Sequence, residues 1–142
     1  MILVIVFGII KYSDNKVVVE IPTWNTICFE KTCFDIEIAD TSPERQQWLM
    51  HRTSMDKSNG MLFVFDQPGV HSFWMKNTLI PLDIIWMNEE YQVVYIQHSA
   101  QPCIVDTCQS YNPSVMAYYA LELNGWVAGK IGLEIWETIE RK

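Results

Sequence analysis

The stretch FWMKNTLIPLDIIWM, residues 73–87, governs the prediction of the fold. Two apolar runs, residues 73–75 and 84–87, enclose a polar segment that contains Lys76, Asn77 and Asp83. Both faces of each run carry large apolar side chains, which predicts strands that are covered on both sides. A lysine at the end of such a strand must reach solvent or meet a carboxylate, and Asp83 or Glu122 could be that partner.

Further strand patterns lie on both sides of this stretch. The run GMLFVF (60–65) predicts a strand, and DQPG after it predicts a turn. Residues 83–98 have the pattern of a hairpin that turns at EE. Two later strands are predicted at VMAYYALEL (115–123) and EIWETIE (134–140). Residues 25–40 form an earlier hairpin pattern, and KVVVEIP (16–22) a first strand. These seven or eight short strands predict a mainly β domain, a small sandwich or barrel that is jelly-roll-like.

One short α-helix is predicted after the first hairpin. Thr41 and Glu44 have the spacing of a capping box, and Pro43 lies in the first turn. The loop sequence DKSNG ends the helix by about residue 55.

Length and charge limit the class of protein. A chain of 142 residues forms one domain, which we assign to residues 17–142 after an N-terminal segment and linker at 1–16. A formal net charge of -7, with no basic cluster, disfavours nucleic acid as a partner.

The N-terminal run ILVIVFGII, residues 2–10, is apolar throughout. It is shorter than the roughly 20 residues that a spanning helix needs, and it lacks the flanks of a signal peptide. A truncated anchor, a short anchor and a buried strand remain open, and the anchor is favoured because KYSDNK reads as a linker. The segment is therefore a candidate membrane tether.

Four motifs follow one another in an order that resembles the family called domain of unknown function 192, or uncharacterised protein family 0127. They are ADTSPERQQWLMHRTSM, GMLFVF, FWMKNTLIPLDIIWM and YYALELNGWVAGKIGL, within residues 26–139. The resemblance implies a compact, mainly β domain that is often exported, and no assigned reaction. The family usually has glycine where this chain has Trp48, which implies a different helix contact or an opened groove.

The four cysteines form two pairs of equal spacing, Cys28 with Cys33 and Cys103 with Cys108. If residues 30–31 form the hairpin turn, Cys28 lies opposite Cys33 at a position where side chains approach closely. Two local disulfides are favoured, which indicates an oxidising compartment. The alternatives are a four-cysteine zinc site, which His98 could join, and free or cross-paired thiols. A further alternative is a Cys–His nucleophile pair of His98 or His71 with Cys103 or Cys108.

The polar segment at 76–83 permits two interpretations. It is favoured as a structural cluster, because paired buried charge more often serves the architecture. Alternatively it is part of a small pocket that holds a polar ligand, with the ligand-binding residues Trp74, Lys76, Asn77, Asp83 and Glu122.

The function that these patterns predict is a non-catalytic envelope module, secreted or anchored, that binds a small polar ligand or an envelope protein. No cofactor and no metal are expected. The alternative is a hydrolase or metal-dependent enzyme that uses Asp83 with Glu122, or the cysteines.

Overall fold

The structure is a computed structural model that describes residues 11–13, 16–47 and 49–142. The predicted tether at residues 2–10 and the family departure at Trp48 lie outside the described residues. No helix in the described part of the chain is long and apolar enough to span a membrane.

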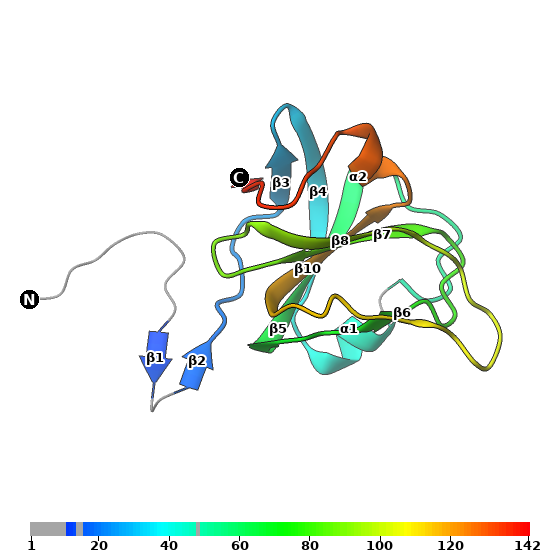
Figure 1. The fold of residues 1–142 in the computed structure, drawn as a ribbon, viewed down its shortest axis with the longest axis horizontal. Helices are drawn as coiled ribbons and strands as arrows, with labels where there is room; N and C mark the ends of the chain where they lie inside the picture. Colours follow the sequence, from blue (N-terminus) through cyan, green and yellow to red (C-terminus); the bar gives the residue numbers. More distant parts are fainter. Residues whose placement is uncertain (1–10, 14–15, 48) are drawn as a thin grey trace, which may run out of the picture.

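The fold is mainly β, as predicted, and consists of one seven-stranded sheet that curls into an open half-barrel (Figure 1). The strand order is β11-β3-β4-β5-β10-β7-β8. The strands are β3 (Thr26–Phe29), β4 (Thr32–Ala39), β5 (Asn59–Gly69), β7 (Leu82–Met87), β8 (Val93–Ala100), β10 (Ala117–Asn124) and β11 (Glu140–Arg141).

Two small ribbons and two short helices complete the fold. β1 (Lys11–Ser13) pairs with β2 (Lys16–Val18), and β6 (Phe73–Trp74) pairs with β9 (Ser110–Tyr111). The helix α1 (Ser42–Gln47) connects β4 to β5, which pair in parallel. The helix α2 (Val127–Lys130) follows β10 at the opposite end of the half-barrel from α1 (Figure 1).

The first hairpin has the predicted register. β3 and β4 are antiparallel, with Cys28 opposite Cys33 and Phe29 opposite Thr32, so residues 30–31 form the turn. The predicted capping box also forms, since the Thr41 amide donates to Glu44 at 3.1 Å and the Glu44 amide donates to the Thr41 hydroxyl at 3.4 Å. Both features were predictable because they depend on residues close in sequence.

Four strand predictions were wrong in extent. The strand expected at residues 16–22 is reduced to β2, Lys16–Val18, which pairs with β1 in a separate ribbon. The DQPG segment does not turn but continues β5 to Gly69. The expected strand at 134–140 is reduced to β11, which begins at Glu140. The strand expected in VHSFWMK, residues 70–76, is only the two residues of β6. Trp74 is 57% exposed because this ribbon lies outside the main sheet.

The two faces of the curled sheet carry separate cores. One core contains Ile85, Leu121 and Leu123 and packs against Ala128 of α2. The other contains Ile84, Trp86 and Met61 and packs against Leu49 after α1 and against Met75 after β6. β7 is buried along its whole length, as predicted, because it lies between β10 and β8 and both of its faces are covered.

Candidate functional site

Asp83 is a structural residue of the first core. Its side chain is fully buried and accepts three backbone hydrogen bonds, from the amides of Ser99 (2.7 Å), Trp126 (3.0 Å) and Ala128 (2.7 Å). These contacts fasten the start of α2 and the end of β8 to β7. Backbone donors therefore compensate the buried carboxylate, and the expected partnership with Lys76 is wrong.

Lys76 instead binds the loop between β8 and β9. Its Nζ donates to the carbonyl oxygen of Val105 at 2.7 Å and lies 3.6 Å from the fully exposed carboxylate of Asp106. The Lys76 side chain is 22% exposed, so it reaches solvent rather than forming a buried pair. A lysine at the end of a buried strand must reach solvent or pair with a carboxylate. Lys76 reaches solvent, so it needs no buried carboxylate as a partner.

Asn77 holds the backbone turn that follows β6. Its φ is 55°, a left-handed conformation that asparagine tolerates better than most residues. Its amide donates to the Cys103 carbonyl at 2.8 Å, and its carbonyl accepts from the His51 amide at 2.8 Å. The residue therefore joins three segments of chain.

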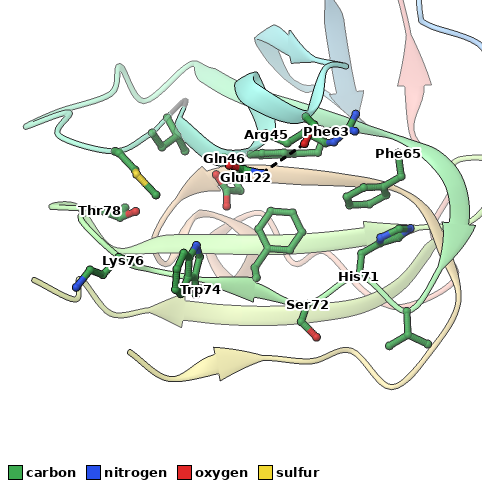
Figure 2. A pocket seen from close by; sticks show the side chains of 15 residues that line it. Arg45, Gln46, Phe63, Phe65, His71, Ser72, Trp74, Lys76, Thr78 and Glu122 are labelled. Carbon is green, nitrogen blue, oxygen red and sulfur yellow. Dashed lines mark hydrogen bonds between the residues drawn. The ribbon is translucent and has the colours of Figure 1, made fainter. Parts of the chain in front are cut away.

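A cavity of about 540 Å³ opens between α1, β5 and β6, on the face of the sheet that carries the core with Ile84, Trp86 and Met61 (Figure 2). Its volume is in the range of small-molecule sites. Its walls combine aromatic, aliphatic and polar side chains: Ser42, Arg45, Gln46, Leu49, Met50, Phe63, Phe65, Val70, His71, Ser72, Phe73, Trp74, Lys76, Thr78 and Glu122.

Glu122 points from β10 into this cavity (Figure 2). Its cross-strand neighbours on the same face are Met61 of β5 and Ile84 of β7, both fully buried. No hydrogen bond or ion pair from the described residues reaches its carboxyl group. Burial without a partner raises the pKa of Glu122 to about 8, so the group holds its proton at neutral pH in the empty protein.

Arg45 and His71 belong to the same wall, and each has partners. Arg45 donates to the carbonyls of Asp40 (2.6 Å) and Val64 (2.8 Å) and to the carboxylate of Asp66 (2.8 Å). The His71 ring stacks on Phe65 with centroids 3.6 Å apart, and burial lowers the pKa of His71.

All four cysteines form the predicted disulfides, Cys28–Cys33 and Cys103–Cys108. A zinc site and a cysteine nucleophile would each need free thiolates, which these cysteines do not have while they form disulfides. The second disulfide closes the loop that binds Lys76, because Val105 and Asp106 lie between its two cysteines.

The structure thus separates the five residues that the sequence grouped as a ligand site. Trp74, Lys76 and Glu122 line the cavity, whereas Asn77 and Asp83 do not. The sequence patterns did not place Arg45, Phe63, Phe65 or Thr78 at a site. One available signal was that Glu122 stands alone as an acid within an otherwise apolar strand.

The family model of DUF192, described as Uncharacterized ACR, matches residues 25–140. The chain belongs to the DUF192 family. This confirms the resemblance that the four motifs indicated.

Two solved structures are similar to this member of DUF192. A protein of unknown function from Novosphingobium aromaticivorans DSM 12444 is 32% identical, with a TM-score of 0.73, and the match covers 81% of each chain. A protein from Sinorhizobium meliloti 1021, described provisionally as a transcription regulator, is 28% identical with a TM-score of 0.69, covering 77% of this chain and 82% of that one. No curated protein matches the chain.

Proposed function

We propose that this protein is an extracytoplasmic, non-catalytic module that binds a small polar ligand in the cavity beneath α1. The buried Glu122 carboxyl carries the proposal, because it faces this cavity without a hydrogen-bond partner among the described residues. Glu122 is 4% exposed and has no protein partner among the described residues, which leaves a partner for its carboxyl group to be supplied from the cavity.

The remaining walls suit such a ligand. Trp74 is 57% exposed and Phe73 is half-buried, so apolar surface is available beside the acid. Thr78 and Ser72 add hydroxyl groups that can donate or accept hydrogen bonds. The combination of an apolar lining with a few polar groups is typical of small-molecule sites.

Binding is favoured over the hydrolytic alternative by the register of the sheet. Glu122 lies opposite Ile84, whereas Asp83 lies opposite Leu123, so the two acids point to opposite faces of the sheet. They cannot flank one bond of a substrate as a catalytic pair must. The cysteines are not available as nucleophiles while they form disulfides.

The compartment is proposed from the two disulfides, which persist in oxidising surroundings. The net charge of -7 disfavours nucleic acid as a partner of this chain. Residues 2–10 remain the proposed membrane tether.

The location can be tested in the native host. We expect a full-length protein tagged at the C-terminus to fractionate with the envelope or the medium, with both disulfides intact in mass spectrometry without reductant. A soluble and fully reduced cytoplasmic pool would contradict the proposed compartment.

Ligand binding can be tested by a thermal-shift screen of small polar metabolites. We expect hits that lose at least tenfold in affinity in Trp74→Ala, which removes an apolar wall of the cavity, and in Glu122→Gln, which removes the carboxyl group that meets the ligand. Trp136→Ala is the matched control, since Trp136 is 67% exposed and does not line the cavity. Hits that bind both tryptophan variants equally well would place the site elsewhere, and a screen without hits would remove the support for binding.

A further inference from the structure

When Glu122 ionises, no cationic side chain that lines the cavity is free to pair with its carboxylate. On the wall formed by α1, Arg45 is paired with Asp66 at 2.8 Å. After β6, Lys76 is paired with Asp106 and the Val105 carbonyl, and Figure 2 shows it at the far end of the cavity from His71. On the flanking strands, the cross-strand partners of Glu122 are the uncharged Met61 and Ile84.

His71 does not supply the missing counter-charge. A nitrogen of its ring lies 2.9 Å from the Gln67 carbonyl, the ring stacks on Phe65, and burial lowers its pKa, which favours the neutral form. Every cationic side chain that lines the cavity is therefore neutral or already paired. A ligand that binds the ionised form of Glu122 therefore brings the positive charge itself.

The comparison with Asp83 supports this conclusion. Both acids are buried on neighbouring strands, but Asp83 receives three backbone amides at 2.7–3.0 Å and Glu122 receives no donor from the described residues. An acid retained for the fold is given donors, as Asp83 is. Glu122 has instead an open space in front of it.

The walls around Glu122 suit an organic cation. The rings of Phe63, Phe65, Phe73 and Trp74 line the cavity, and aromatic rings attract ammonium groups through their negative faces. The net charge of -7 also favours the approach of cations. A bare metal ion suits the site less well, because no group of three or more ligating side chains occurs among the described residues.

We propose that the ligand is a small organic cation whose ammonium group binds Glu122 and whose alkyl part packs against Phe73 and Trp74. This inference rests on the proposed binding function and names the class of ligand for the same cavity.

Binding of a cation should release a proton from Glu122, and this release can be measured. In the empty protein the Glu122 carboxyl is protonated at pH 7, whereas ion pairing requires the carboxylate. Binding therefore breaks the O–H bond of the carboxyl and releases the proton to the buffer. Because burial raises the pKa of Glu122 to about 8, cation binding at pH 7 should release most of one proton per bound cation. The affinity should rise about tenfold per pH unit until about pH 8 and then level off.

The test is isothermal titration calorimetry of the full chain with matched pairs of probes. One pair is choline and its uncharged isostere, in which a tert-butyl group replaces the trimethylammonium group; the other is butylammonium and butanol. We expect a cation to bind at least tenfold more tightly than its isostere, with proton release revealed by buffers of different ionisation enthalpy. Glu122→Gln should abolish both the preference and the pH dependence, and Glu134→Gln, an exposed acid, should change neither.

Each other outcome overturns the inference. If the uncharged isosteres bind as tightly, or if cations bind without releasing protons, the ligand is not recognised through its charge. If no cation binds while the wider screen finds an uncharged or anionic ligand that depends on Glu122, the binding function stands and only the class is wrong. If no compound of any class binds, both proposals fail.

Discussion

Replacing Asp83 with alanine is expected to lower the free energy of unfolding by about 3–5 kcal/mol. The substitution leaves the amides of Ser99, Trp126 and Ala128 without their acceptor in a fully buried position. An unsatisfied buried donor costs about 1–3 kcal/mol, and more when it has lost a charged acceptor. Asp83→Asn should lose less, because the amide oxygen can still accept. Urea unfolding at pH 7 measures all of these differences.

Lys76→Ala provides the contrast to Asp83→Ala. It removes a contact with a loop carbonyl and an exposed ion pair, so the loss should be about 1 kcal/mol or less. Because the two side chains share no contact, the double variant should be additive within about 0.5 kcal/mol. If Lys76→Ala lowered the free energy of unfolding by several kcal/mol and the double variant were strongly non-additive, Lys76 and Asp83 would form a buried pair, contrary to the contacts seen in the structure.

Replacing Glu122 with glutamine should stabilise the empty protein by about 3–5 kcal/mol at pH 8. The folded protein raises the pKa of Glu122 from 4.5 to about 8, so between these pH values the folded state holds a proton that the unfolded state has lost. The contribution of this group to stability is therefore lost as pH rises from about 4.5 to about 8. Glutamine resembles the protonated acid and does not titrate, so the stability of the variant should not fall with pH for this reason.

The measurement is urea unfolding of wild type and Glu122→Gln from pH 4 to pH 8. We expect similar stabilities near pH 4, where the acid is protonated in both states, and a gap that widens with pH. Glu134→Gln, at an exposed position, should run parallel to wild type. A Glu122→Gln variant that is less stable than wild type at pH 8 would show that the carboxylate has a stabilising partner in the folded chain.

These two predictions connect stability with function. Asp83 braces the fold, so its loss should unfold the protein. Ionisation of Glu122 lowers the free energy of unfolding of the ligand-free protein. Its replacement by glutamine should raise the free energy of unfolding and weaken ligand binding, as is common when binding groups are removed. Two buried acids one strand apart are thus distinguished by opposite changes in the same unfolding experiment.

The sequence by itself determined the features that depend on neighbours along the chain. The turn at residues 30–31 fixed Cys28 opposite Cys33, and the spacing of Thr41 and Glu44 fixed the start of α1. The apolar run at 84–87 determined a strand buried on both faces. The four motifs were sufficient to indicate the family, which the family model confirmed over residues 25–140.

Only the tertiary structure decided where the polar groups of the 73–87 stretch and of β10 point. Asp83 and Lys76 are seven positions apart, yet Asp83 faces α2 and Lys76 faces the disulfide loop. Glu122 meets neither of them, because pairing with Ile84 rather than with Asp83 turns it to the other face. The physical reason is that successive side chains of a strand alternate between faces, so the register of β10 against β7 decides which acid meets backbone amides and which meets an open cavity.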